Sequence, residues 1–437
     1  MGDHITPGAE RRLLLGIGVI YLALALVYSW VIPLGYGPDE KRHYALVKRL
    51  AEKGRLPLTI NGQEEDGAIV LHPPLYYAGL VPLYVATRPL GDAAAQRALR
   101  FVSPLLCGGA LFFFYLLLRG LYPEGAALRL GAVGLAAFWP HLQLEAAVIN
   151  NDTLAILFGA LLFWQLARME RRAPTPRESL WIGLTWAAFA NTKATALTLA
   201  PLWAIWLALV FGRRGLRQGA FWQALALGYG PLLLLGSWWY LRNLALYGEV
   251  VPNIAGYMQP VDMRTGRIYE PLELLYHGLL FVGPFWWLVG RAIKGLFLSV
   301  WAQVGWFPKA LNPFIVALLL LLLAAAGLGN LMAWWQKRRG SGRPTPLYPP
   351  TVWMMFVAFA LVYASTAFMA IFIHVGFYQG GRYLLPVFWG FVFFIVYGLA
   401  HLAPKAQARL FLGLTSFFLL LNGACLYNLI TYWNPMY

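Results

Sequence analysis

The chain has 437 residues, of which 60% are hydrophobic and 12% are charged. A soluble domain of this length could not cover so much apolar surface, so the composition excludes an ordinary soluble protein and indicates a membrane protein. The net charge is +16. In a membrane chain, anionic headgroups and phosphates explain such an excess better than a nucleic acid does, and we expect no nucleic-acid partner.

Runs of about 20 apolar residues recur along the chain and predict an all-α, polytopic membrane helix bundle of about eleven spans. The predicted spans are 13–34, 98–118, 128–147, 152–168, 179–191, 194–212, 219–241, 311–334, 351–373, 384–402 and 409–430. The first run is long for a signal peptide and has no obvious small-residue cleavage site, which favours an uncleaved span. The two cysteines, Cys107 and Cys425, both lie in apolar runs, so no disulfide framework is expected.

Alternate loops carry basic clusters, among them Arg11-Arg12 and Lys337-Arg338-Arg339. The positive-inside rule makes that side cytoplasmic and places the N-terminus there. We therefore expect a multi-pass protein of the cell (inner or plasma) membrane, with a functional site on the outer face.

Two long segments, 35–97 and 242–310, then face outward. In the first, apolar residues alternate with charges over 40–56, which predicts an amphipathic helix lying on the membrane. In the second, 274–290 and 292–306 predict surface-lying or re-entrant helices, with a further pair of spans as the alternative. We expect one membrane-embedded domain over 1–437, with no soluble carboxy-terminal domain.

The acidic pair Asp39 and Glu40 directly follows the first span, and His43 comes one turn later. Ionisable groups at such a place are costly beside lipid and need a reason. Helix-start chemistry after Pro38 is the ordinary explanation. The location favours catalysis instead, with a carboxylate as general base for an acceptor hydroxyl. The other alternative is a hard divalent cation held near Asp39 and Glu40.

Further candidates lie on the same outer side. His72 precedes Pro73-Pro74 and either reaches a phosphate or acceptor or caps the turn. Asn151 is a candidate N-cap for the next span, and the adjacent Asp152 is placed to meet the Asp39 region. Lys193, at the tip of a predicted hairpin, either snorkels or binds phosphate.

Two arginines complete the set. Arg242 ends a span beside aromatic residues and is either an interfacial anchor or a phosphate ligand. Arg382, with Tyr383 beside it, follows Gly380-Gly381. Paired glycines let the backbone come close to a ligand, and an arginine can donate two hydrogen bonds to a phosphate. A substrate-binding role is therefore favoured for Arg382.

Four short motifs occur in order along the chain: Pro38-Asp39-Glu40 with His43, His72-Pro73-Pro74-Leu75, Asn151-Asp152, and Gly381-Arg382-Tyr383-Leu384-Leu385-Pro386. In these motifs and in its layout the chain resembles the GT-C superfamily of polytopic glycosyltransferases. The likeness is greatest to bacterial members akin to protein O-mannosyltransferases and to the aminoarabinose transferase of lipid A.

The resemblance implies an inverting transfer of a sugar from a polyprenyl-phosphate donor to an acceptor hydroxyl at the outer membrane face. It implies that Asp39, beside Glu40, is the catalytic base. It also implies that basic residues hold the lipid phosphate, for which Arg382, Lys193 and Arg242 are the candidates. The acceptor (protein, lipid or polysaccharide) is not indicated, and no cofactor is indicated beyond the divalent cation named above.

Two other classes of protein share some of these features. A transporter also carries intramembrane acids and broken helices, but it usually shows repeated halves and ionisable residues near the midplane. A non-catalytic membrane scaffold would use the outer segments to dock a partner. Because the charges gather at one membrane face, we rank the transferase first, the transporter second and the scaffold third.

Overall fold

The computed structural model describes residues 5–60, 63–70, 72–170, 172–250, 283–301, 312–340, 348–369 and 377–433. Its helices in chain order are α1 (Pro7–Val31), α2 (Glu40–Lys53), α3 (Leu75–Thr87), α4 (Asp92–Arg100), α5 (Val102–Leu121), α6 (Ala126–Ala137), α7 (Pro140–Glu145), α8 (Asp152–Arg168), α9 (Pro176–Ala190), α10 (Thr195–Thr198), α11 (Pro201–Gly215), α12 (Gly219–Pro231), α13 (Trp238–Tyr247), α16 (Gly283–Trp301), α17 (Pro313–Gly340), α18 (Pro350–Phe368), α19 (Trp389–Leu402) and α20 (Gln407–Trp433). Shorter elements are the strands β1 (Thr59–Ile60) and β2 (Gln63–Glu64), which pair antiparallel, and the turns of helix η1 (Glu65–Gly67), η2 (Arg88–Leu90), η3 (Leu232–Gly236) and η5 (Phe377–Val387).

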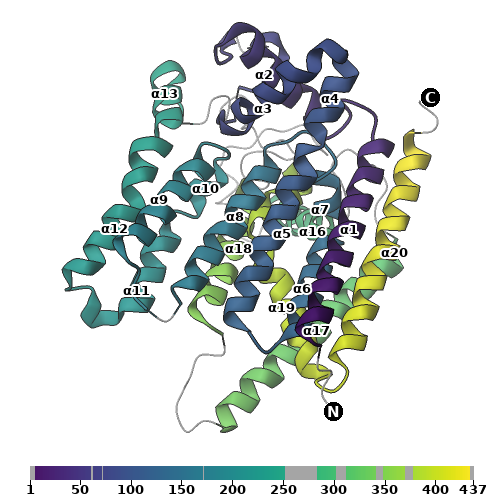
Figure 1. Cartoon of the computed structure of the whole chain (residues 1–437), viewed down its shortest axis with the longest axis vertical. Helices are drawn as coiled ribbons and strands as arrows, with labels where there is room; N and C mark the ends of the chain where they lie inside the picture. Colours follow the sequence, from purple (N-terminus) through teal and green to yellow (C-terminus); the bar gives the residue numbers. More distant parts are fainter. Residues whose placement is uncertain are drawn as a thin grey trace.

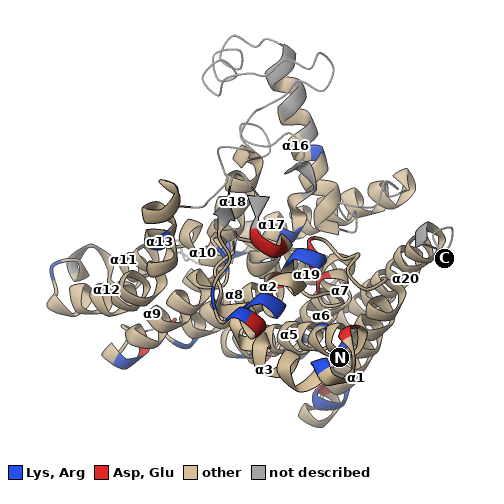
Figure 2. Ribbon diagram, turned by 90° about the horizontal axis from the view of Figure 1, so that it is seen from above, with Lys and Arg blue, Asp and Glu red and all other residues tan. Residues whose placement is uncertain are grey.

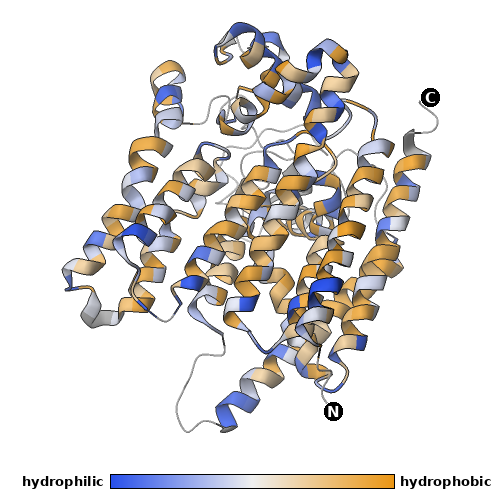
Figure 3. Ribbon diagram, in the orientation of Figure 1, coloured by the Kyte–Doolittle hydropathy of each residue, from blue (hydrophilic) through white to orange (hydrophobic). Residues whose placement is uncertain are grey.

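The described residues include seven helices that are long and apolar enough to cross a membrane, or eight if the bent pair Gly380–Val387 and Trp389–Leu402 is one span. Hydrophobic residues predominate along these helices (Figure 3). The prediction of a polytopic, all-helical membrane protein is confirmed. The number of full-length spans in the described part is smaller than the eleven expected, because several apolar runs form shorter or broken helices.

The predicted span 128–147 is the clearest correction. It divides into α6 and α7 at Phe138-Trp139, because Pro140 has no N–H with which to continue the helical ladder. All residues from 127 to 153 are buried, so protein surrounds this break. Asn422 of α20 donates its Nδ2 proton to the Phe138 carbonyl at 2.7 Å and so satisfies an acceptor that the break leaves open.

The amphipathic helix predicted over 40–56 is present as α2, which ends three residues early. Gly54, with φ +62°, takes the left-handed conformation that terminates the helix. Figure 1 shows α2, α3 and α4 together across one end of the bundle. In the view onto that end, charged residues gather on α2, while the long helices around it are largely uncharged (Figure 2).

The second outer segment, 242–310, lies mostly outside the described residues, as does the first part of the loop 374–383. Within the described part, α16 runs without interruption from Gly283 to Trp301. The boundary predicted between 290 and 292 is therefore wrong, since a single helix passes through Arg291 and Lys294.

Candidate active site

Asp39 occupies the turn that joins α1 to α2. Its backbone is left-handed, at φ 56° and ψ 8°, and it stands at the N-cap of α2 without making a side-chain cap hydrogen bond. A non-glycine residue in this conformation typically costs about 1–3 kcal/mol and occurs preferentially at functional sites. Helix-start chemistry therefore does not explain this side chain, and its carboxylate is directed elsewhere.

The Asp39 carboxylate faces η5. Arg382 donates from Nη2 to Oδ2 of Asp39 at 2.8 Å, and Arg42 lies at 3.5 Å from the other oxygen. Burial alone would raise the pKa of Asp39, but the charge and hydrogen bond of Arg382, together with the other positive groups nearby such as Arg42, outweigh burial and lower this pKa below its ordinary value. Asp39 is therefore ionised at neutral pH, and about a fifth of its side chain is exposed.

Two histidines line the same place. The His43 ring stacks on His72 with centroids 5.5 Å apart, and its Nδ1 lies 2.6 Å from the hydroxyl of Tyr77. Burial lowers the pKa of His43 to about 3 and that of His72 well below its usual value. Both rings are therefore neutral at pH 7 and serve as hydrogen-bonding groups, and Tyr77 is a neighbour that the sequence did not single out.

Lys193 and Asp152 form a buried ion pair beside this group. The Lys193 ammonium also lies 4.5 Å from the centre of the Tyr383 ring, next in sequence to Arg382. The structure thus brings together seven of the nine predicted site residues: Asp39, His43, His72, Asp152, Lys193, Arg382 and Tyr383. We call these seven residues the outer cluster.

Glu40 was predicted as catalytic, but it points away from the outer cluster. It is fully buried, and Arg100 donates to its two carboxylate oxygens at 2.6 Å each. Three backbone N–H groups, from Gly35, Gly37 and Ile149, also donate to it. These donors surround Glu40, which therefore links α2 to α4 and to the end of α1. Arg100 strengthens this link because it also donates to the carbonyls of Ser29, Ile32 and Pro33.

Arg242 also stays apart from the outer cluster. It contacts the Asn243 side chain at 3.0 Å and the Pro57 carbonyl at 3.5 Å, and its guanidinium lies 5.0 Å from the Trp239 ring centre. This arrangement matches the interfacial-anchor alternative. The N-cap candidate Asn151 likewise makes no cap bond and donates instead to the Thr192 carbonyl at 2.7 Å. Asn150 caps α8 in its place, since its Oδ1 accepts from the Thr153 N–H at 3.1 Å.

The divalent-cation alternative does not fit the donors found. Asp39 and Glu40 are engaged by different arginines, so their carboxylates do not converge. Within the described ranges there is no group of three or more His, Cys, Asp or Glu side chains arranged to hold a metal ion. A cation at Asp39 would have to displace Arg382.

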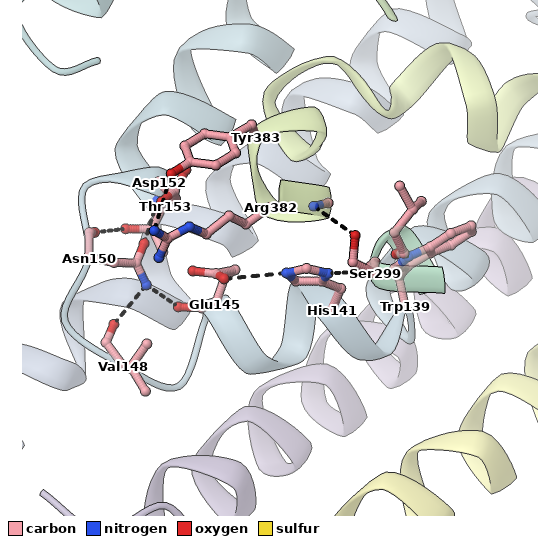
Figure 4. A network of polar contacts seen from close by, with 12 residues as sticks. Trp139, His141, Glu145, Val148, Asn150, Asp152, Thr153, Ser299, Arg382 and Tyr383 are labelled. Carbon is pink, nitrogen blue, oxygen red and sulfur yellow. Dashed lines mark hydrogen bonds and ion pairs between the residues drawn. The ribbon is translucent and has the colours of Figure 1, made fainter. Parts of the chain in front are cut away.

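Below the outer cluster lies a second polar group that the sequence did not reveal (Figure 4). The Nε2 of His141 lies 3.4 Å from Glu145, and its Nδ1 contacts the carbonyl of Ser299. The Ser299 hydroxyl accepts from the Gly381 N–H at 2.9 Å. The spacing of four residues between His141 and Glu145 on one helix was the available signal, but it sits inside an apolar run.

No protein-family model and no curated protein matches the chain. Among solved structures, it is similar to ArnT from Cupriavidus metallidurans bound to undecaprenyl phosphate, with 16% identity and a TM-score of 0.49 over 95% of this chain and 74% of that one. It is also similar to the Archaeoglobus fulgidus oligosaccharyltransferase in complex with Zn and sulfate, with 15% identity and a TM-score of 0.47 over 96% of this chain and 52% of that one. The chain thus spans about half the length of the archaeal protein.

Proposed function

We propose that the chain is an inverting glycosyltransferase that moves a sugar from a polyprenyl-phosphate donor to an acceptor hydroxyl at the outer face of the membrane. The observation that carries this proposal is the pairing of Asp39 with Arg382 inside the outer cluster. Two carboxylates, Asp39 and Asp152, and two cations, Arg382 and Lys193, stand at one end of an apolar bundle, where a lipid-borne phosphate would arrive. Asp152 is buried in its pair with Lys193, which leaves the partly exposed Asp39 as the carboxylate that a substrate can reach. Such a set suits a reaction that needs one base and an anion-binding site.

Asp39 is the base in this scheme. It takes the proton of the acceptor hydroxyl as that oxygen forms a bond to the anomeric carbon. The bond from that carbon to the phosphate oxygen breaks on the opposite side, and the polyprenyl phosphate leaves with the electron pair. Because a phosphate leaves as a stable anion, no second carboxylic acid is required to protonate it, in contrast to the pair used for glycoside hydrolysis.

Arg382 binds the donor phosphate, and Lys193 supports it from the Asp152 side. The phosphate then competes with Asp39 for the Arg382 guanidinium. Any weakening of the Asp39–Arg382 pair raises the pKa of Asp39, because burial then acts with less opposition. Donor binding therefore makes Asp39 a stronger base at the moment when the acceptor needs one.

The neutral histidines and Tyr77 line the acceptor side. His43 and His72 offer ring nitrogens without adding charge, which suits hydrogen bonding to hydroxyl groups. The acceptor class stays open among protein, lipid and polysaccharide. The positive-inside pattern of the short loops supports a cytoplasmic N-terminus and an outer site in the cell membrane.

The test is sugar transfer by the purified protein in lipid, using a panel of radiolabelled polyprenyl-phosphate sugars. Wild type is compared with Asp39→Asn, which removes the base but keeps the shape of the side chain. Turnover by the wild type that disappears in a folded Asp39→Asn variant supports the proposal. Donor binding without release of sugar by the wild type, accompanied by movement of a solute across sealed vesicles, favours the transporter instead.

A further inference from the structure

Glu145 is the most unusual buried acid in the described part of the chain. Its side chain is fully buried, and neither carboxylate oxygen accepts a hydrogen bond from the residues described. A buried ionised carboxylate without donors is costly, often by several kcal/mol. Its neighbour within ion-pair distance is the His141 ring, whose Nε2 lies 3.4 Å from Oε1.

The contacts of His141 restrict where its protons lie. Its Nδ1 faces the carbonyl oxygen of Ser299, which can only accept a hydrogen bond, so Nδ1 carries a proton. Its Nε2 faces Glu145, and an ionised carboxylate also only accepts. The contact is therefore satisfied only when one further proton is shared by the pair, on Nε2 or on the carboxyl group. In either form the pair has no net charge.

This pair acts on Arg382 by two routes. The first is mechanical, because the Ser299 carbonyl binds His141 while the Ser299 hydroxyl binds the N–H of Gly381, next to Arg382. The second is electrostatic. The Glu145 carboxyl group lies beside the Arg382 side chain, and its charge acts on that arginine (Figure 4).

We propose that His141 and Glu145 are a positioning pair for Arg382, holding one proton between them so that the guanidinium is left to Asp39 and to the donor phosphate. Without that proton, Glu145 would be an ionised, unpartnered carboxylate and would draw the guanidinium away from Asp39. The other charges near Arg382 are Asp39 and Asp152, which are negative, and Lys193 and Arg42, which are positive, so the whole group carries one net positive charge only while the pair is neutral. The inference rests on the proposed function for its ligand, a polyprenyl phosphate.

The test exploits the shape of asparagine. The side-chain nitrogen of His141→Asn falls where Nδ1 was, so the bond to Ser299 can form, but no atom replaces Nε2. We expect the affinity of the protein in lipid nanodiscs for polyprenyl phosphate to fall about tenfold, equivalent to about 1.4 kcal/mol. Adding Glu145→Gln removes the competing carboxylate, and the double variant is expected to recover most of the loss.

His401→Asn is the matched control, because His401 also contacts a backbone carbonyl through Nδ1, that of Tyr397, and has no carboxylate partner in the described contacts. It should bind the lipid as the wild type does. If His141→Asn does not fold, His141→Ala with and without Glu145→Gln also removes Nε2 and makes the same comparison. Unchanged affinity in the single variant, or a double variant no better than the single, overturns the positioning pair. A wild type that binds no polyprenyl phosphate at all instead overturns the proposed function.

Discussion

The carboxylate of Asp39 and the guanidinium of Arg382 meet at 2.8 Å across 343 residues of sequence. The pair joins the first turn after α1 to the η5 segment that precedes α19. Both side chains are partly exposed, at about a fifth of their surface. They therefore form a charged pair that a ligand can reach, whereas the Glu40–Arg100 pair is fully buried.

The first prediction concerns the base. Asp39→Asn keeps the left-handed backbone, which asparagine tolerates, and removes the charge, so transfer should fall at least about 100-fold with the fold intact. The measurement is initial rate at saturating donor, alongside thermal unfolding. Asp66→Asn is the matched control, since Asp66 also has a positive φ of 58° but lies on η1, where it pairs with the buried Arg49 and the exposed Lys53. Full activity in Asp39→Asn would show that Asp39 is not the catalytic base.

The second prediction concerns pH. Arg382 lowers the pKa of Asp39, so in the wild type Asp39 stays ionised down to about pH 4 or below and kcat/KM should show no acid limb from it above that pH. In Arg382→Gln the opposing charge is gone while burial remains, so the pKa of Asp39 rises and an acid limb should appear at higher pH. The contribution of the pair to stability follows the same sign, being present above the ordinary pKa and lost as pH falls through the lowered one. An identical pH profile in both proteins would contradict this account.

The third prediction separates Glu40 from Asp39. Glu40→Gln leaves the buried Arg100 without its counter-charge, and breaking a buried pair in this way typically costs about 3–5 kcal/mol. The expected result is a large fall in the unfolding temperature in detergent, with catalysis by the remaining folded protein largely kept. Glu178→Gln, which breaks an exposed pair with Arg172, should cost at most about 1 kcal/mol. Stable but inactive Glu40→Gln protein would restore Glu40 to the catalytic group.

The fourth prediction tests the seating of η5. A Cβ at Gly381 would stand 2.4 Å from the Ser299 carbonyl carbon and 2.5 Å from the Val300 nitrogen, distances that require the backbone to move. Gly381→Ala should therefore lower both stability and donor affinity by displacing Arg382. Gly413→Ala, where nothing lies within 4 Å, should be neutral or slightly stabilising because alanine favours a helix. Equal behaviour of the two variants in unfolding and donor-binding measurements would show that the close approach of η5 to α16 is unimportant.

Much of the helical layout can be predicted from the sequence, because every helix that crosses the membrane needs an apolar run of similar length. The span predicted over 152–168 coincides with α8, and α20 extends the run predicted over 409–430 by two or three residues at each end. Helix α1 begins six residues before the run predicted over 13–34 and ends three residues before it does. The break at Pro140 was missed because hydropathy alone does not register the missing N–H of a proline.

The sequence allowed most residues of the site to be predicted, but not the contacts that each of them makes. Asp39 and Glu40 are neighbours in sequence, yet their carboxylates take opposite directions because Asp39 adopts a left-handed backbone. No local pattern reveals which arginine each acid will meet, since Arg100 and Arg382 lie 60 and 343 residues away. Tyr77 and Ser299 were missed for the same reason, because their roles depend on tertiary contacts alone.

The break between α6 and α7 depends on Asn422, a residue that is synthesised late. Its amide binds the Phe138 carbonyl, 284 residues earlier, and its Oδ1 accepts from the hydroxyl of Tyr28 on α1 at 2.9 Å. While the ribosome is still making the preceding helices, that carbonyl therefore lacks this partner inside an apolar environment. The early helices can enter the membrane before then, but their final packing waits for α20. A nascent chain stalled before α20 should accordingly be a substrate for membrane quality control, even though every residue of the outer cluster has already been translated.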